Sequence, residues 1–477
     1  MNKKPKAAKE PKELGTVVDL AERMMTKLEK TDCLYRYGDQ IVRVSEGKVK
    51  PMRKDDIAWI VRREFETLSE TNVSAVSNDI IHTPDSKLKR IDTFTTKPVF
   101  VQNTGVHTLE LITAPGFANN IYYEPDEALR GVEFLTDADL PKARASLDRL
   151  KEPLFDFPFD PMDKIEGNKA AYLSMMLTLI LRPAIDGVTP CFFMRGNGPS
   201  LGKGLLNEMA SLIVFGRRAS LVSNPKTDTE WKTRLDSILM EGKQFVVIDN
   251  VVGKLDSQEF ASVLTSRTRD CRRLHSSDST TAPVNTVFAV NGNFVDLDDD
   301  ITERSVMILL KHKDARSRNM EDFEIQKTYG ESPDTFVGGK RRVQFLQDLI
   351  NIVCAWKNAG SHRRQKITMS KYGACEGIVG GILDYVWPES KFLSGNKDAR
   401  AEANSEEQET IEFIEALRRA FPNCDIHPIV VTDIRQAIKD SDLCDSLPDA
   451  LKTGTNDTYF ANRLGKWMKA KLLFPQS

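Results

Sequence analysis

The chain lacks the marks of several specialised protein classes. Its seven cysteines are scattered over 477 residues, without a Cys-x-x-Cys pair or a Cys/His cluster at zinc spacing, which argues against a zinc ribbon or a disulfide framework. Glycine (27) and proline (22) are too sparse for a fibrous or disordered chain. Lysine plus arginine (67) nearly balances aspartate plus glutamate (69), so the chain is not a globally basic nucleic-acid coat. Any polyanion must therefore bind a local patch.

Long hydrophobic runs are also missing. The longest apolar run, residues 170–181, is interrupted by Ser174 and Thr178 and is too short for a bilayer, which requires about 20 residues. Residues 1–13 carry no apolar stretch and so do not form a secretory signal. We expect a flexible, basic, solvated tail there, with a DNA-contacting arm as the alternative. These absences predict a protein of a reducing compartment with no membrane partner.

What is present is a balance of 40% hydrophobic and 29% charged residues, which is typical of a soluble globular protein with a sizeable core. The length favours two to four domains of about 150 residues each. From Thr189 onward, short buried runs alternate with helix-period segments, a pattern that predicts an α/β fold with a mainly parallel sheet covered on both faces. The runs are 191–194, 220–222, 245–248, 284–290 and 306–310.

Other segments predict helices and linkers around this sheet. The periodicity predicts helices over residues 139–150, 168–181 and 341–356. An aromatic, Pro-rich stretch, residues 154–161, marks a domain boundary, and a charged stretch, residues 394–407, has the composition of a linker.

The most specific motif is CFFMRGNGPSLGKGLLNEMASLI, residues 191–213, in which a buried strand runs through a Gly-rich loop into a helix. Such a loop directs successive N–H groups at phosphate oxygens, and Lys203 can reach the β- and γ-phosphates of a nucleotide. We expect the loop and the start of its helix to bind ATP through Asn197, Gly198, Pro199, Ser200, Leu201, Gly202, Lys203, Gly204 and Leu205.

Two positions depart from the GxxxxGK[ST] pattern of phosphate loops. Asn197 stands at the first glycine position, and Gly204 stands where a serine or threonine would supply a hydroxyl ligand to Mg²⁺. The metal must then be held by other groups and by waters. An ordinary strand-to-helix turn is the alternative interpretation.

A second strand, FVVIDN, ends in Asp249 and Asn250. A carboxylate at the tip of a buried strand beside the loop strand is suited to hold Mg²⁺ or its water, so Asp249 is the candidate metal ligand. Asn250 occupies a position where ATPases of this type usually carry an acid. An amide can orient water but cannot accept its proton, so catalysis then depends on Asp249 or on a residue supplied from elsewhere.

Two further positions complete the candidate site. The strand that ends in Asn291-Gly292-Asn293 can place an amide between Asp249 and the γ-phosphate to position water; Asn293 is the first choice and Asn291 the second. Arg304, directly before an apolar strand, can face the γ-phosphate of a neighbouring subunit. A surface salt bridge to a nearby acid is the alternative for Arg304.

Taken together, these segments resemble the AAA+ ATPase domain of phage, plasmid and prophage replication proteins, the superfamily 3 helicase-like half of viral primase-helicases. The resemblance depends on NGPSLGKGLL (197–206), DTEWKTRLDSILMEGKQFVVIDN (228–250), LTSRTRDCRRLH (264–275), VFAVNGN (287–293) and ITERSVMI (301–308). It implies a homo-oligomer, a hexameric ring, that hydrolyses ATP with Mg²⁺ at its subunit interfaces and threads DNA through its centre. It also implies location in the cytoplasm of a bacterial host.

In that family a hairpin before the strand with the polar tip directs basic side chains into the channel. The matching stretch is residues 270–283, with Arg272, Arg273 and His275 available for DNA; a solvated basic face is the alternative. A basic helix near the C-terminus, with Arg463 and Lys466, fits a winged-helix-like domain in which that helix meets DNA. No primase chemistry is visible, so a primase half is absent or belongs to a separate protein.

The sequence therefore predicts an AAA+ P-loop NTPase core with an N-terminal α+β domain and a C-terminal winged-helix-like domain. The expected boundaries are 1–13 for the tail, 14–150 for the N-terminal domain, 151–188 for a helical lead-in, 189–315 for the ATPase core, 316–393 for a helical region, 394–408 for the linker and 409–477 for the C-terminal domain. The expected function is that of a DNA helicase or translocase in replication of a phage, plasmid or other mobile element, acting on single-stranded or forked DNA. An ATP-switched initiator or loader with little unwinding is the main alternative. An ATPase effector of a defence system is a third.

Overall fold

The computed structural model describes most of the chain from Gly15 to Asn396 and scattered segments beyond it. The gaps before Asn396 are residues 32, 46–47, 83–87, 104–107, 161–165, 199, 252–253, 273–278, 294–295, 298, 312–319 and 395. Beyond Asn396 the described residues are 413–414, 416–421, 430, 433–434, 436–437, 447–448, 451 and 457–472. Among the described helices, none combines the length and the apolar character that a membrane span needs.

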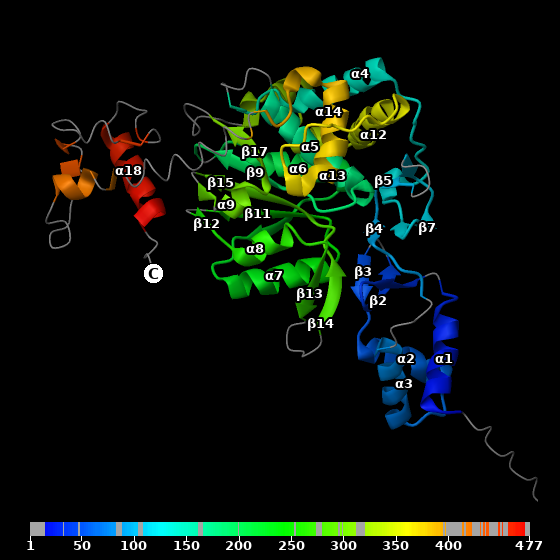
Figure 1. Ribbon diagram of the computed structural model, residues 1–477. Helices are drawn as coiled ribbons and strands as arrows, with labels where there is room; N and C mark the ends of the chain where they lie inside the picture. The colour runs from blue at the N-terminus through cyan, green and yellow to red at the C-terminus, as the bar shows by residue number, and fades with distance from the viewer. Residues whose placement is uncertain are drawn as a thin grey trace, which may run out of the picture.

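The centre of the molecule is a sheet of five parallel strands in the order β10-β11-β15-β9-β17 (Figure 1). Its strands are β9 (Cys191–Gly196), β10 (Ser220–Ser223), β11 (Phe245–Val251), β15 (Val287–Asn293) and β17 (Ser305–Leu310). Four of them contain one of the predicted apolar runs, and β15 overlaps the run 284–290 from Val287 onward, so the predicted parallel sheet is confirmed. Because the strands are parallel, their carboxyl ends share one edge, and the loops that leave that edge are neighbours in space.

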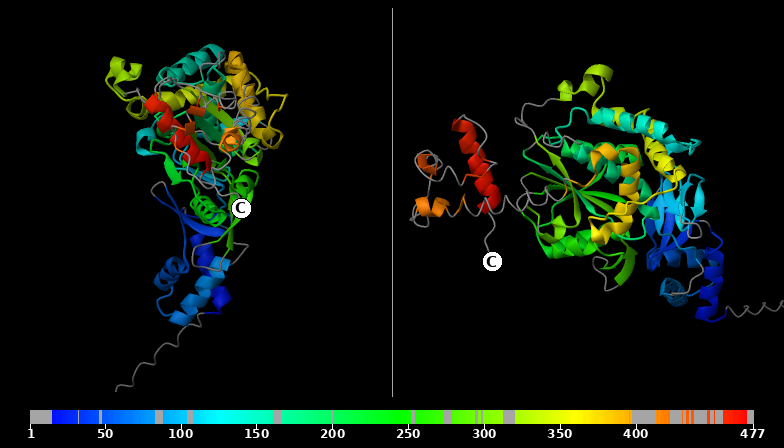
Figure 2. Two further views of the ribbon diagram at one scale, coloured as in Figure 1. Left: turned by 90° about the vertical axis from the view of Figure 1, so that its left-hand side faces the viewer. Right: turned by 45° about the horizontal axis from the view of Figure 1, so that its top comes forward.

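Both faces of the sheet are covered, as its sequence pattern requires (Figure 2). Along β9, Phe192 and Met194 enter one hydrophobic core, whereas Cys191 and Phe193 enter the other. The other core strands alternate in the same way, because successive side chains of a strand point to opposite faces. The first core is closed by α5 (Gly167–Leu181), α6 (Lys203–Phe215) and α12 (Arg342–Asn358), and the second by α7 (Asp228–Met240) and α8 (Gln258–Val263).

Helix α4 (Leu140–Lys151) packs along α12 in the helical layer. The Arg149 guanidinium donates hydrogen bonds to both oxygens of Asp348 on α12, and Asp348 is fully buried. The domain boundary expected at residue 150 falls at the end of this helix and stays a prediction. The buried Ala143, Leu147 and Leu150 of α4 belong to the first hydrophobic core, which also contains residues of α5, α6 and α12.

The N-terminal part is α+β. Its elements are α1 (Val17–Leu28), β1 (Leu34–Tyr37), β2 (Gln40–Ser45), β3 (Lys48–Pro51), α2 (Lys54–Glu64), α3 (Glu70–His82), β4 (Thr93–Thr95), β5 (Val99–Gln102), β6 (Leu109–Ile112), β7 (Gly116–Ala118) and β8 (Ile121–Tyr123). The three helices pack with their own hydrophobic core, and β1-β2-β3 forms an antiparallel sheet. The helices lie at the lower right in Figure 1, away from the central sheet.

An antiparallel hairpin, β13 (Thr268–Arg272) and β14 (Ser279–Pro283), lies between α8 and β15 in the chain. The turn between β1 and β2 rests on it: Asp39 N donates to Thr281 O at 3.4 Å, and Thr281 N donates to Asp39 Oδ2 at 3.3 Å. A Cβ atom at Gly38 (φ +56°) would lie only 1.9 Å from Thr281 O. The N-terminal part therefore contacts the hairpin through a turn that requires glycine.

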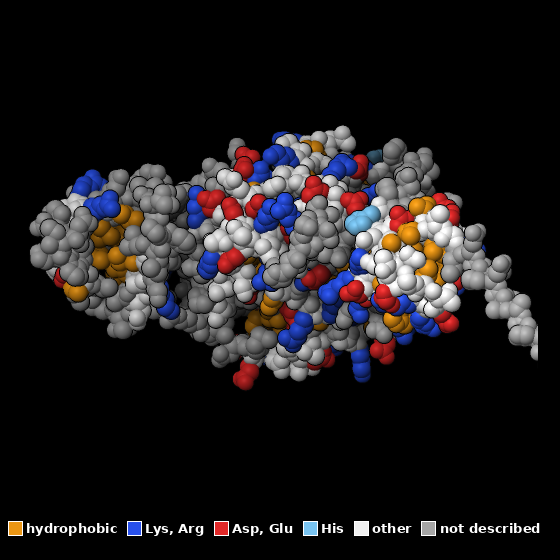
Figure 3. Space-filling model, turned by 90° about the horizontal axis from the view of Figure 1, so that it is seen from below, with side chains coloured by type: hydrophobic (Ala, Val, Ile, Leu, Met, Phe, Trp, Pro, Cys, Tyr) orange, Lys and Arg blue, Asp and Glu red, His pale blue; other side chains and the backbone are white. Residues whose placement is uncertain are grey.

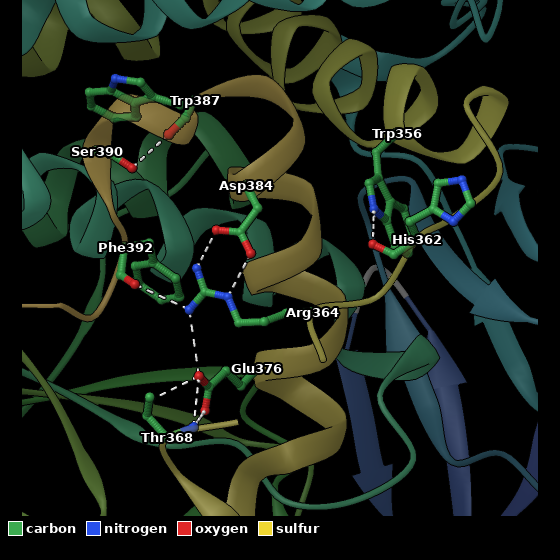
Figure 4. Close-up of polar contacts among 9 residues, drawn as sticks. All are labelled: Trp356, His362, Arg364, Thr368, Glu376, Asp384, Trp387, Ser390 and Phe392. Atoms are coloured by element: carbon green, nitrogen blue, oxygen red, sulfur yellow. Dashed lines mark hydrogen bonds and ion pairs between the residues drawn. The ribbon is translucent and has the colours of Figure 1, made fainter. Parts of the chain in front are cut away.

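The Gly-rich stretch near residue 380 is helical. It forms a π-helical turn, η7 (Glu376–Gly380), that continues into α14 (Gly381–Val386). Arg364 crosses this turn and donates to both oxygens of Asp384 at 2.7 and 2.5 Å, and it lies 3.5 Å from the buried Glu376 (Figure 4). A Cβ atom at Gly380 would lie 2.8 Å from Arg364 Nε, so the missing side chain makes this crossing possible.

The remaining described elements are short, apart from one helix near the C-terminus. They are β12 (Lys254–Leu255), β16 (Asp296–Leu297), α9 (Asp299–Thr302), α10 (Glu324–Tyr329), α11 (Pro333–Gly338), α13 (Gly373–Cys375) and α18 (Asp457–Leu472). In the C-terminal segments, Phe413 and Trp467 pack edge to face within a small separate core. The described residues there include no strand, so the winged-helix-like domain stays a prediction. The tail at 1–13 and most of the expected linker lie outside the described residues.

Candidate nucleotide-binding site

The Gly-rich loop turns between the carboxyl end of β9 and the start of α6 at Lys203. Gly202, immediately before the helix, has φ +88°, and a Cβ atom there would lie 2.7 Å from Phe157 Cε1. Both the backbone conformation and the aromatic neighbour therefore require glycine. Ser200 also has a left-handed φ, +60°. The loop thus has the tight curvature that phosphate binding by backbone N–H groups demands.

Not every predicted loop residue faces a ligand. Leu201 is fully buried and Leu205 packs against the first core, so their side chains anchor the loop to the protein interior. Asn197 and Ser200 are exposed and Gly198 is buried, whereas Pro199 lies outside the described residues. The exposed positions and the backbone are therefore what this loop offers to a nucleotide.

Lys203 reaches back across the loop. Its Nζ donates to Gly198 O at 3.3 Å and to Asn293 Oδ1 at 2.5 Å. Burial lowers the pKa of Lys203 to about 8, and the nearby negative charge of Asp249 acts in the opposite direction. A cation that has lost much of its hydration, beside a curled loop, is arranged to meet an anion such as a phosphate group.

Gly196, the last residue of β9, makes room for this lysine. A Cβ atom at Gly196 would lie 2.6 Å from Lys203 Nζ and 3.2 Å from Asn293 Oδ1. Gly196 is not among the site residues that the sequence predicts. The signal that could have identified it is a glycine at the end of a buried strand, where a side chain is otherwise favoured.

Asp249 lies at the carboxyl edge of β11, as its position after an apolar run predicts. The expectation that this strand lies beside the loop strand is wrong, because β15 lies between β11 and β9. The pairing of β11 with β15 shifts between Ile248 and Val251, so Asp249 and Asn250 occupy a bulge. Asn250 has φ +58° and an exposed side chain, and asparagine tolerates this conformation better than most residues. Asp249 is half-buried, with one carboxylate oxygen, Oδ1, bonded to Asn291 Nδ2 at 2.9 Å.

The two amides at the tip of β15 have different partners. Asn293 contacts the loop lysine, and Asn291 contacts the candidate metal ligand Asp249. Sequence spacing could not separate them, because residues two apart in a strand share a face. The structure brings both of them together with Lys203 and Asp249.

Asn207 is a site residue that the sequence analysis missed. It lies on α6 one turn after Lys203, is fully buried, and its Nδ2 donates to Asn291 Oδ1 at 2.7 Å. An amide on the inward face of an otherwise apolar helix, at i+4 from the loop lysine, was the available signal.

Arg304 lies at the opposite edge of the sheet. It directly precedes Ser305, which pairs with Cys191 at the amino end of β9. Its side chain is largely buried and forms an ion pair with Asp300 at 2.9 Å. Within one chain, then, Arg304 does not meet Lys203 or Asp249. Its action on a neighbouring subunit's nucleotide stays a prediction, and the alternative, a local salt bridge, is present.

The described part of the hairpin carries one exposed arginine, Arg272, whose backbone N–H donates to Asp236 Oδ2. Arg269 is half-buried and forms ion pairs with Asp236 and Glu259, at 2.8 and 2.5 Å, and therefore holds the hairpin base. The predicted DNA contacts Arg273 and His275 lie outside the described residues. On the face seen from below, basic and acidic side chains are interspersed, as the balanced composition suggests (Figure 3).

On α18, Lys466 is exposed and Arg463 is half-buried. The buried Leu464 and Trp467 face the small C-terminal core, so the basic positions and the apolar positions divide the helix into two faces. Contact of this helix with DNA stays a prediction.

The residues at the carboxyl edge fit a nucleotide with Mg²⁺. The glycine-dependent loop offers N–H groups, Lys203 offers a cation, and Asp249 offers one carboxylate. Mg²⁺ at nucleotide sites typically takes one or two carboxylates together with phosphate oxygens and waters, so one carboxylate suits it. A Cβ atom at Gly204 would meet no atom within 4 Å, which leaves space beside the loop for water.

No protein-family model and no curated protein matches the sequence. Among solved structures, the A-form apo structure of the NrS-1 C-terminal region is 12% identical, with 95% of this chain and 93% of that chain covered and a TM-score of 0.41. The SCCmec type IV Cch active helicase is 10% identical, with 92% and 88% covered and a TM-score of 0.32. JCV helicase bound to an acetamide compound is 12% identical, with 56% and 72% covered and a TM-score of 0.25. With TM-scores below 0.5, these likenesses carry no conclusion about this chain.

Proposed function

We propose that this chain is an ATP-dependent DNA helicase or translocase of the AAA+ superfamily 3 type that acts in replication of a phage, plasmid or other mobile element. The observation that carries the proposal is the meeting of Lys203, Asn293, Asn291 and Asp249 at the carboxyl edge of one parallel sheet. Such edges are where ligands bind in open α/β sheets. The hairpin before β15 is the second supporting feature, because it gives the fold an element that can carry basic side chains to DNA.

ATP would be held by the loop at residues 197–204, with Lys203 on the phosphates. Asp249 would hold Mg²⁺, directly or through a water, and Mg²⁺ supplies neutralisation of charge that develops on the phosphate oxygens. Asn293 holds the lysine amine within 2.5 Å and keeps it aimed at the loop. Because a helix N-terminus adds a positive dipole end, the start of α6 favours the same anion.

For the activation of the attacking water, this chain offers few groups that can accept a proton. Asn250 is exposed at the bulge, where an acid would accept a proton, and an amide can only orient water. Asn293 and Asn291 are amides too. Proton acceptance therefore falls to Asp249 or to a group from a neighbouring subunit, and we expect hydrolysis to be slow without DNA.

Arg304 would act on the nucleotide of the adjacent subunit in a hexameric ring, where an arginine stabilises charge in the transition state. Mixing two variant chains in one oligomer tests this role of Arg304. Chains with Lys203→Ala and chains with Arg304→Ala should each be inactive alone, whereas mixed oligomers should regain part of the turnover at interfaces that combine an intact Lys203 with an intact Arg304. Absence of recovery in oligomers that do mix would contradict it.

DNA contacts would come from Arg272, Arg273 and His275 on the hairpin and from Arg463 and Lys466 on α18. Phosphate contacts of this kind are independent of sequence, as a motor requires. A separate primase or another replication protein would supply the priming chemistry that this sequence lacks.

An ATP-switched initiator or loader is the second candidate, and the exposed Asn250 is the observation that favours it. The two functions separate in a strand-displacement assay on a forked duplex with ATP and Mg²⁺. A motor displaces the strand, and Lys203→Ala does not. Nucleotide-dependent assembly on DNA without displacement would favour the initiator.

A further inference from the structure

Three side chains form a buried chain of hydrogen bonds beneath the phosphate loop. Asn207 Nδ2 donates to Asn291 Oδ1 at 2.7 Å, and Asn291 Nδ2 donates to Asp249 Oδ1 at 2.9 Å. Asn207 is fully buried and Asn291 nearly so. The chain thus joins the second turn of α6 to the tip of β15 and then to the tip of β11.

The direction of these hydrogen bonds is determined by Asp249. An ionised carboxylate can only accept, so Asn291 must present its Nδ2 to Asp249 and its Oδ1 to Asn207. Asn207 must in turn donate. Its own Oδ1 is left buried without a hydrogen-bond partner among the described residues. A buried orphan oxygen is destabilising, and an apolar side chain would avoid it, so folding alone gives little reason for an asparagine here.

Asp249 needs such support because of its position. It lies in the bulge where the β11–β15 pairing shifts, next to the left-handed Asn250. Within the part of the chain that the structure describes, Asn291 alone donates a hydrogen bond to this carboxylate, and it engages Oδ1. Oδ2 is thereby left for another ligand.

The loop lacks the hydroxyl group that usually binds Mg²⁺ together with the carboxylate. Gly204 stands where phosphate loops carry a serine or threonine that contacts Mg²⁺ directly. A Cβ atom at Gly204 would meet nothing within 4 Å, so the place of that side chain is open.

We propose that Asn207 is a positioning residue that, acting through Asn291, fixes Asp249 for Mg²⁺ and so offsets the hydroxyl missing at Gly204. This inference rests on the proposed nucleotide site and adds to it the residue that governs metal affinity. Groups that orient a metal ligand typically change metal affinity by about 10- to 100-fold when they are removed.

The test is Asn207→Leu, which keeps the branched shape and the number of heavy atoms of the side chain and removes the donor. Two titrations are made on the purified chain. In the first, Mn²⁺ is added in the presence of ADP and the free ion is followed by electron paramagnetic resonance. In the second, a fluorescent ADP is added in the absence of metal. We expect Mn²⁺ affinity to fall by about tenfold or more and metal-free nucleotide affinity to stay within about twofold. Asn207→Asp should have the same effect, because a carboxylate repels Asn291 Oδ1 and turns that amide away from Asp249.

Ser211→Ala is the matched control, since Ser211 is buried one turn further along α6 and donates to Arg217 O away from the site. It should leave Mn²⁺ affinity unchanged. Gly204→Ser, which the open space admits, should strengthen Mn²⁺ binding and should rescue it in the Asn207→Leu background. The rescue keeps the test informative even if Asn207→Leu lowers overall stability.

The outcomes separate the two proposals. If the wild-type chain binds neither ADP nor Mn²⁺-ADP, the nucleotide site itself is wrong. If the wild-type chain binds both but Asn207→Leu leaves Mn²⁺ affinity unchanged, the proposed role of Asn207 is overturned and the nucleotide site stands. Loss of Mn²⁺ affinity that Gly204→Ser cannot restore would also contradict the offset between these two positions.

Discussion

Lys203 Nζ lies 2.5 Å from Asn293 Oδ1, and this contact ties the end of the Gly-rich loop to the tip of β15. The lysine belongs to the loop that would hold the nucleotide, and the amide belongs to the strand that also carries Asn291, the partner of Asp249. The two halves of the candidate site are therefore joined by hydrogen bonds within the protein. Such preorganisation lowers the cost of ordering the site when a ligand binds.

Glycine at position 202 is expected to be indispensable, whereas glycine at 204 is not. Gly202→Ala combines a left-handed φ with a clash against Phe157 and should lower the free energy of unfolding by about 1–3 kcal/mol and abolish nucleotide binding. Gly204→Ala, in the first turn of α6 with open space around it, should be neutral or stabilising by up to about 1 kcal/mol. Urea unfolding and fluorescent-ADP titration measure both. Equal effects of the two changes would contradict the loop geometry.

The buried Lys97 should make the free energy of unfolding depend on pH. Its side chain is fully buried, and its Nζ donates to Gln244 Oε1 and lies 4.9 Å from the centre of the Phe215 ring. Burial lowers the pKa of Lys97 to about 7, and the positive charge of Arg217 makes a smaller contribution in the same direction. Between about pH 7 and 10 the unfolded chain holds more protons at this residue than the folded chain, so the free energy of unfolding should rise with pH. Below about pH 7 both states are protonated and the burial cost is fully present.

Lys97→Met should remove this dependence. The variant is expected to be more stable near neutral pH, by an amount on the order of a few kcal/mol, because each pKa unit corresponds to about 1.36 kcal/mol. Urea unfolding from about pH 6.5 to 9.5 tests it, with the exposed Lys54→Met as control. Buried thiols whose pKa is raised, such as Cys375, contribute with the opposite sign at the upper end of this window, so the difference between wild type and Lys97→Met is the quantity to follow. A difference that does not change with pH would contradict the lowered pKa of Lys97.

The hairpin arginines should matter for DNA and not for basal turnover. Alanine at Arg272 and Arg273 should spare ATP hydrolysis without DNA, remove its stimulation by single-stranded DNA, and reduce the slope of log affinity against log salt by about 1–2. Arg218→Ala is the control, because Arg218 is an exposed arginine elsewhere on the surface. DNA stimulation that survives the double change would exclude the hairpin as the main contact.

Gly38 should be needed for the contact between the N-terminal part and the hairpin. Residue 38 has a left-handed φ, and the Cβ added by Gly38→Ala would lie 1.9 Å from Thr281 O. The β1–β2 turn must therefore move away from β14. Amide hydrogen exchange at Asp39 and Thr281 should become faster. Gly131→Ala shares the left-handed φ but meets no neighbour within 4 Å, and should leave these amides unchanged. Unchanged exchange in Gly38→Ala would show that the contact is not maintained in solution.

Sequence patterns predicted the central sheet well, for physical reasons. Buried parallel strands need continuous apolar runs, and the loop, the acid and the amides each follow such a run, so their shared edge could be inferred. The pattern could not separate Asn291 from Asn293, which share a face and differ only in which neighbour each one meets.

Long-range packing accounts for most of what the sequence did not reveal. Asn207 is one turn beyond Lys203 in the chain, but its role depends on the strand that crosses beneath it. The place of α4 depends on α12, almost 200 residues later, through pairs such as Arg149 with Asp348. Neither relationship leaves a local pattern, because the contacts are made by the tertiary fold.

The most direct test of the central claim is steady-state ATP hydrolysis by the purified chain, with and without single-stranded DNA, beside Lys203→Ala. The account predicts turnover that requires Lys203, is slow alone and rises with DNA. Turnover that persists in Lys203→Ala, or an absence of nucleotide binding in the wild-type chain, would contradict the assignment of this loop as the ATP site.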